Sequence, residues 1–317
     1  MRQVDLLCSV LTGTLVALSV TPTPAGILNV VTGARTAYSL RRLDDDYTGY
    51  AIEVRRSSDN ATQDIGFDAS GQLDTAALLG FVGSGDGYVT TWYDQVGSLD
   101  VSDGDHSNQP QIVRAGAVIV AAANDLPAVE FGADRNDVLH ATYSTPWLAE
   151  NTIFTAGQFL SSPTNGNLIM RLWTLVGQSG ATRLSTGGDA VSDSPRLSVA
   201  YGSPFTCRES SYVLDTTNVL VATTVVDATQ ASGSDYLELF ANGDSVLHYS
   251  NLSITQDDLF LALGGYDTSG NNFGLNGYLQ EVIFYDNLDA GQRQIIEGNL
   301  MGRYIPEPGT AFLLAFG

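Results

Sequence analysis

Residues Gly87–Gln95 read Gly-Tyr-Val-Thr-Thr-Trp-Tyr-Asp-Gln, and this stretch decides the fold. Six consecutive residues, at positions 88 to 93, are aromatic or β-branched, which is typical of a β-strand. Strict alternation would place positions 88, 90, 92 and 94 on one face and positions 89, 91, 93 and 95 on the other. Both faces carry bulky side chains, so the sequence predicts a central strand that is covered on both sides.

This strand ends in two polar side chains, Asp94 and Gln95, where the chain enters a polar loop at 96–110. A rigid strand that delivers a carboxylate and an amide to a loop rim is a common way to build a binding site. We therefore predict that both residues bind carbohydrate. The alternative is that Asp94 only caps a turn.

Short strand-like runs separated by turn residues continue along most of the chain. Many short strands with few helices predict an all-β fold, a two-sheet antiparallel β-sandwich. The runs that alternate or are uniformly apolar are 35–43, 50–56, 64–67, 112–121, 128–131, 138–143, 152–160, 167–176, 182–185, 196–201, 219–226, 236–240, 245–249, 259–264 and 277–285.

Two helices and one tight hairpin are also predicted. Asp74 is a good N-cap for a short helix over 73–82. Asp289 and Gln292 form a capping-box pattern at the start of a second helix, over 289–303. Its residues Ile296, Leu300 and Tyr304 recur every four positions and should face the sandwich. Asn242-Gly243, between two strand-like runs, predicts a two-residue hairpin.

The chain divides into three parts. Residues 1–25 contain an apolar run, Leu6–Val20, which predicts either a secretory signal peptide or an N-terminal arm that packs on a neighbouring subunit. Asp5 and Pro24 fit a signal peptide poorly, so we favour the arm. The run is too short to span a bilayer comfortably. Residues 26–305 form the sandwich, and 306–317 form a C-terminal tail.

The chain is strongly acidic. The 317 residues carry a net charge of −21, and all 14 basic residues are arginine. A field this negative repels phosphate backbones, so nucleic-acid binding is not expected. Acidic excess without lysine suits a protein that is kept soluble in salty water, and genomic base composition is the alternative explanation. The two cysteines, Cys8 and Cys207, form no metal motif or disulfide framework.

Two stretches carry a resemblance to known families. The first contains Tyr-Ser-Leu-Arg-Arg-Leu at 38–43, Ala-Ile-Glu-Val-Arg-Arg-Ser-Ser at 51–58 and Trp-Tyr-Asp-Gln at 92–95. The second is Gly-Tyr-Leu-Gln-Glu-Val-Ile-Phe-Tyr at 277–285, with the helix after it. Together they resemble the concanavalin-like (laminin-G-like) jelly-roll modules of phage tail and virion-surface proteins. The first also resembles the catalytic sandwich of the α-L-arabinofuranosidase B family.

The second resemblance can be tested on residues. Asp267 stands about where that family carries its acid/base. The family's nucleophile is a glutamate on a strand that corresponds to 196–201, and this stretch, Arg-Leu-Ser-Val-Ala-Tyr, has no carboxylate. A retaining glycosidase needs two carboxylates. The resemblance therefore implies a shared scaffold without shared chemistry.

Candidate site residues lie in several loops. Trp147, Asp267 and Asn271 complete the predicted carbohydrate site with Asp94 and Gln95, since an aromatic face suits the apolar side of a sugar ring. Another loop holds three carboxylates, and such oxygen-rich loops can bind Ca²⁺, although they are also commonly just solvated. Its residues are Asp100, Asp103 and Asp105.

We therefore expect a non-enzymatic structural or adhesion protein of a phage tail or capsid surface. Its partners would be other virion subunits, or copies of itself bound through the N-terminal arm, and cell-surface polysaccharide. A secreted glycoside hydrolase similar to the arabinofuranosidases is one alternative. An exported lectin-like or extracellular matrix protein is the other.

Overall fold

The computed structural model describes residues 26–132, 137–143, 150–161, 169–177, 183–189, 195–201, 206–228, 235–252, 254, 258–265 and 274–305. The N-terminal arm, the C-terminal tail, Trp147, Asp267 and Asn271 lie outside these residues, so the predictions made for them stay predictions. Among the described residues, no helix has the length and apolar character needed to cross a membrane.

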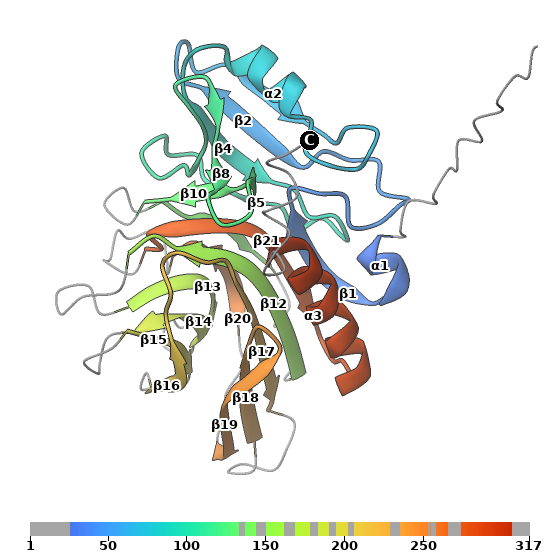
Figure 1. Ribbon diagram of the computed structural model, residues 1–317, viewed down its shortest axis with the longest axis vertical. Coiled ribbons are helices and arrows are strands. Elements are labelled where there is room, and N and C mark those ends of the chain that lie inside the picture. Colours follow the sequence, from blue (N-terminus) through green and yellow to red (C-terminus); the bar gives the residue numbers. More distant parts are fainter. Residues whose placement is uncertain are drawn as a thin grey trace, which may run out of the picture.

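The strands form two facing antiparallel layers (Figure 1). In the first layer, β21 lies at the centre, with β1 and β10 on one side and β12, β17, β18 and β19 following on the other. The bounds are β1 Ala34–Ser39, β10 Val129–Phe131, β12 Glu150–Phe159, β17 Leu220–Asp227, β18 Asp235–Ala241, β19 Asp244–Leu252 and β21 Gly277–Tyr285.

The second layer runs in the order β3, β2, β4, β5, β11, β20, β13, β14, β15 and β16. The bounds are β2 Ile52–Arg56, β3 Thr62–Ile65, β4 Gly87–Trp92, β5 Val101–Ser102, β11 Leu139–Thr142, β13 Ile169–Gly177, β14 Arg183–Asp189, β15 Arg196–Tyr201, β16 Thr206–Val213 and β20 Asp258–Leu263.

The core between the layers is largely apolar. Trp173 on β13 meets Phe284 on β21 edge to face, with ring centroids 5.7 Å apart. Thr186 on β14 and Thr224 on β17 share a buried hydrogen bond of 2.6 Å. These contacts join strands of different layers, so the predicted two-sheet antiparallel sandwich is confirmed.

The layers are also joined by hydrogen bonds along one side. Strand β6 (Gln111–Arg114) pairs with β4 of the second layer and with β10 of the first. Among the described strands, β19 and β16 pair on one edge only and end their layers on the opposite side. The short strands β7 (Ala117–Val118), β8 (Val120–Ala121) and β9 (Leu126–Pro127) form local pairs near β6.

Both predicted helices are confirmed. Helix α2 spans Thr75–Val82, and the Asp74 side chain accepts a hydrogen bond from the Ala77 amide. Helix α3 spans Ala290–Tyr304 and begins with the predicted capping box of Asp289 and Gln292. Residues Ile296, Leu300 and Tyr304 are buried, as predicted, in a second apolar cluster on the outer face of β12, β17 and β21. Figure 1 shows α3 lying alongside β12 and β1.

The Asn242-Gly243 hairpin is also confirmed. Both residues have positive φ, 52° and 84°, as a turn matching the twist of the flanking strands β18 and β19 requires. Four elements were not predicted: the short helix α1 (Ile27–Val30), strand β16, strand β9, and strand β5 within the expected loop 96–110.

Strand β4 is central, as predicted, but its strict alternation is wrong. Glu53 of β2 pairs with Thr91 and Val54 pairs with Val89, so Thr90 is an extra residue in the ladder. Such a bulge changes which side chains share a face. As a result, Val89 and Trp92 both lie in the core, although simple alternation places them on opposite faces.

Candidate functional site

Asp94 lies in the interior of the protein and not on a loop rim. It is 3% exposed. Its carboxylate accepts hydrogen bonds from the backbone amides of Ala37, Val96, Gly97 and Leu99, at 2.9–3.2 Å. These bonds fold the start of the 96–110 loop back onto β1. Asp94 therefore caps this turn, and carbohydrate contact by Asp94 stays a prediction.

Gln95 is similarly engaged. Its side-chain oxygen accepts a hydrogen bond from the Leu43 amide, and its side-chain nitrogen donates to the carbonyls of Ser39 and Arg41. The side chain is 3% exposed. The structure thus places Asp94 and Gln95 together, where Asp94 ties the end of β4 to β1 and Gln95 ties it to the end of β1 and the segment after it.

The acidic loop organises itself through its own backbone. Asp100 accepts a hydrogen bond from the Asp94 amide, Asp103 from the Asp105 amide, and Asp105 from the amide and hydroxyl of Ser107. Burial and the neighbouring Asp94 raise the pKa of Asp100. Among the described residues, no three histidine, cysteine or acidic side chains are arranged to hold a metal ion. The Ca²⁺ site predicted at Asp100, Asp103 and Asp105 stays a prediction.

A pocket of about 150 Å³ lies at one end of the first layer, and we call it the β12 pocket. It is formed where β12 begins, β17 ends, β18 begins and β21 ends. Pockets for drug-sized ligands usually measure about 300–1,000 Å³, so this one suits a single small group. Its lining residues are Glu150, Asn151, Thr152, Val225, Val226, Asp227, Tyr236, Asp286, Asn287 and Leu288.

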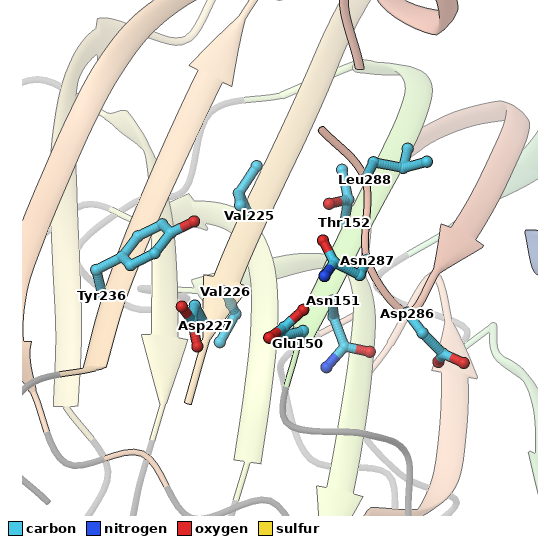
Figure 2. A pocket seen from close by; sticks show the side chains of 10 residues that line it. All are labelled: Glu150, Asn151, Thr152, Val225, Val226, Asp227, Tyr236, Asp286, Asn287 and Leu288. Atoms are coloured by element: carbon cyan, nitrogen blue, oxygen red, sulfur yellow. The ribbon is translucent and has the colours of Figure 1, made fainter. Parts of the chain in front are cut away.

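Strand pairing brings two carboxylates together in this pocket. Glu150 is the cross-strand partner of Asp227. Figure 2 shows both side chains between Tyr236 on one side and Asp286 on the other. Burial and the nearby carboxylates, Asp227 foremost, raise the pKa of Tyr236, so its hydroxyl stays protonated and can donate a hydrogen bond. The carboxylate of Asp286 forms an ion pair with the Arg35 guanidinium, with an N–O distance of 2.6 Å.

The pocket therefore offers hydrogen-bond acceptors on carboxylates, a donor and an acceptor on the exposed amide of Asn287, a phenol and an aromatic face. Sugar hydroxyls both donate and accept, and sugar rings have an apolar face, so this mixture suits a saccharide.

A second polar group lies on the outer face of the second layer. Arg171 on β13, Asp189 on β14 and Ser198 on β15 are each at most 1% exposed. Cys207 on β16 donates a hydrogen bond to Asp189 at 2.6 Å. Burial and this bond raise the pKa of the Cys207 thiol to about 12, so it stays protonated and is a poor nucleophile at neutral pH.

Strand β15 is the segment where the arabinofuranosidase resemblance places a nucleophile. Ser198 and Ala200 are on its outer face, and both are fully buried. The nearby carboxylate that sequence reasoning missed is Asp189, on the neighbouring strand. Its only sequence signal was its own acidic side chain, because the expected strand 182–185 stops before it, whereas β14 continues to Asp189.

The residues of the β12 pocket were missed for a different reason. Glu150 and Asp227 come from distant parts of the chain and meet only because β12 pairs with β17. Either carboxylate alone looks like an ordinary polar strand end. A prediction of strand pairing would have been needed to find them.

The comparisons with known proteins show the fold and no more. No family model matches the chain, and no curated protein matches it in sequence. Among solved structures, a Glu-to-Gln mutant of a GH54 α-L-arabinofuranosidase soaked with 4-nitrophenyl α-L-arabinofuranoside is similar, with a TM-score of 0.66 and 13% identity. An arabinofuranosidase complexed with arabinofuranosyl-α-1,2-xylobiose is also similar, with a TM-score of 0.63 and 12% identity.

A GH54 arabinofuranosidase soaked with a cyclic sulfate inhibitor gives a TM-score of 0.64 and 14% identity. In all three cases the match covers 88% of this chain and 64% of the other, so this chain spans less than two thirds of their length. The arabinofuranosidase part of the expected resemblance is thus confirmed for the sandwich fold. The phage-tail part has no support from these structures.

Proposed function

We propose that this protein is a non-enzymatic adhesion protein that binds carbohydrate in the β12 pocket. Two things support carbohydrate as the ligand. The similar solved structures are named as arabinofuranosidases, which act on arabinofuranosides. The β12 pocket presents carboxylates, an amide and a phenol beside an aromatic face, and such a surface can bind sugar hydroxyls and the apolar face of a sugar ring.

The proposal that the protein binds saccharides without cleaving them rests on the composition of β15. The resemblance assigns the nucleophile to this strand, yet its outer face carries Ser198 and Ala200 in place of a carboxylate. A retaining mechanism needs a carboxylate there to attack the sugar. The proposal is therefore a glycosidase-like scaffold that holds saccharides without cleaving them.

The test is a binding titration of the purified full chain with arabinofuranosyl oligosaccharides and with size-matched hexose oligosaccharides. Tyr236→Ala and Asp227→Asn should each weaken binding at least tenfold. Tyr50→Ala is the matched control, because Tyr50 is 51% exposed and lies outside the pocket. Absence of binding to all the saccharides, or equal binding by all the variants, would refute the proposal.

We place the protein on a virion surface, with a secreted location as the alternative. The basis is the sequence resemblance to phage and virion modules and the choice of a packing arm for residues 1–25. The mass of the natural protein's N-terminus separates the two. An intact Met1 excludes cleavage of a signal peptide, whereas a start near position 26 supports export.

A glycoside hydrolase is the second candidate, and one observation favours it. Glu150 and Asp227 are cross-strand partners, so strand pairing places two carboxylates side by side in the β12 pocket. Retaining glycosidases use a pair of carboxylates, one as nucleophile and one as acid/base.

If this candidate is right, the chain will release 4-nitrophenol from 4-nitrophenyl α-L-arabinofuranoside. Glu150→Gln and Asp227→Asn will then abolish the release. Asp267→Asn tests the acid/base position given by the resemblance. No release by the wild-type chain removes the hydrolase candidate and leaves the binding proposal standing.

A further inference from the structure

A second hollow lies beside α3 and is lined by different residues from those of the β12 pocket. It measures about 520 Å³, which is within the usual range for small-molecule sites. We call it the α3 hollow. Its lining residues are Arg41, Leu126, Gly298, Asn299, Gly302 and Arg303.

Two helical glycines keep this hollow open. Gly298 and Gly302 are one turn apart on α3, and a Cβ added at either would meet no atom within 4 Å. Neither has a positive φ among the described glycines, so neither the backbone nor the packing requires glycine. Each costs the helix about 1 kcal/mol relative to alanine. Because glycine has no side chain, these two positions leave the space of the hollow unfilled.

The hollow is cationic in a protein of net charge −21. Arg41 is neutralised by the buried Glu281, to which it donates two hydrogen bonds, and it also donates to the Asn299 side chain. Arg303 donates to the Gln72 side chain. Within the described part of the chain, no carboxylate pairs with Arg303, and its buried Nε has no hydrogen-bond partner. Arg303 is therefore the lining guanidinium that lacks a counter-charge within the part of the chain that the structure describes.

A guanidinium recognises planar oxyanions through paired hydrogen bonds, and carboxylates fit this geometry. The lining adds the amide of Asn299 for hydroxyl groups and Leu126 for an apolar face. Nucleic acid is disfavoured because two arginines in a net acidic protein cannot track a phosphate backbone. Peptide binding usually needs an open strand edge or a long apolar groove, and among the described residues Leu126 is the only aliphatic side chain that lines the hollow.

We infer that the α3 hollow binds the carboxylate of an acidic saccharide residue, a hexuronate, and that Arg303 supplies the recognising charge. This inference rests on the proposed carbohydrate function and adds a substrate class to it. A polysaccharide that carries both neutral and uronate residues would then engage the molecule at two separate places.

The test is calorimetric titration of the full chain with trigalacturonate, with neutral maltotriose and with a triglutamate peptide. Wild type should bind trigalacturonate at least tenfold more tightly than either of the others. Gly302→Phe, which fills the hollow, and Arg303→Gln, which removes its charge, should each reduce trigalacturonate affinity at least tenfold. Gly80→Phe is the matched control, because Gly80 is an exposed helical glycine whose added Cβ also meets no atom.

Thermal unfolding of each variant checks that it is folded. Equal affinity for trigalacturonate and maltotriose, or no effect of filling the hollow in a folded variant, overturns the inference. Equal binding of triglutamate overturns its saccharide part. Arabinofuranosyl binding that depends on Tyr236 but not on Gly302 would keep the proposed function while this inference fails, so the two can fail separately.

Discussion

The carboxylate of Glu281, on β21, is fully buried and accepts four hydrogen bonds. The donors are Ser39, Arg41 with two bonds, and Tyr304. Burial alone would raise the pKa of Glu281, but the charge and hydrogen bonds of Arg41 outweigh it and lower this pKa below its ordinary value. This network fastens α3 to the first layer, so Glu281 is a structural residue.

We expect Glu281→Gln to lower the free energy of unfolding by about 3–5 kcal/mol at neutral pH, because it leaves Arg41 buried without its counter-charge. A carboxylate with a lowered pKa stabilises the fold above its ordinary pKa and loses this contribution as the pH falls through the folded value. The difference between wild type and variant should therefore shrink only below about pH 4.5.

Urea unfolding across a pH series measures both effects. Glu130→Gln is the control, since Glu130 pairs with Arg114, whose side chain is 53% exposed, and such pairs contribute about 0–1 kcal/mol. An equal loss in the two variants would contradict the role given to Glu281.

The role of Asp94 can be tested in the same way. In Asp94→Asn an amide NH₂ replaces one carboxylate oxygen and faces backbone donors that need an acceptor, such as Gly97 and Leu99. Hydrogen bonds to a charged group contribute about 1.5–3 kcal/mol each, so we expect a loss of about 3 kcal/mol or more in urea unfolding. A variant of unchanged stability that no longer binds saccharide would instead support the ligand role predicted from the sequence.

At the scale of elements, the N-terminus of α3 depends on Asp289. Its side chain accepts a hydrogen bond from the Gln292 amide, and the Gln292 side chain accepts one from the Asp289 amide. We expect Asp289→Ala to cost about 1 kcal/mol in thermal unfolding, because the cap is lost. Asp289→Asn keeps an acceptor and should cost little. A larger loss for asparagine than for alanine would contradict the capping role.

Local signals explain which elements could be predicted. The two caps at Asp74 and Asp289 and the Asn242-Gly243 turn each depend on a few neighbouring residues, and all three are confirmed. The bulge at Thr90 could not be predicted, because it is defined by the partner strand β2. Strand β16 was missed since its residues, Thr-Cys-Arg-Glu-Ser-Ser-Tyr-Val, are mostly polar and only its pairing with β15 makes them a strand.

The candidate sites follow the same division. Asp94 and Gln95 were correctly placed at the end of a central strand, but the partners that engage them, in β1 and the segment after it, are distant in the sequence. The β12 pocket and the α3 hollow both combine residues from several elements. Residue types in one stretch can suggest chemistry, whereas a site of this kind requires the pairing of the whole sheet.

At the scale of the whole molecule, the net charge of −21 should oppose the compact state through self-repulsion. The Debye length falls from about 10 Å at 0.1 M salt to about 3 Å at 1 M, so added salt should weaken this repulsion. We expect the unfolding temperature to rise between 0.05 and 1 M NaCl, as measured by calorimetry. Sucrose at matched osmolality is the control, and an unfolding temperature that does not respond to salt would favour base composition as the cause of the missing lysines.

Strands β16 and β19 each pair on one edge only, and they meet at the same side of the sandwich, where Ser211 on β16 donates a hydrogen bond to the Val246 carbonyl on β19. Backbone groups left open along this border have a consequence for crowded solutions. Unused backbone donors and acceptors on a border strand can template the addition of a strand from another molecule. At low salt, electrostatic repulsion between two such acidic molecules opposes contact between their edge strands. High salt would therefore raise the stability of each molecule and, by the same screening, make fibrils or stacked oligomers easier to nucleate.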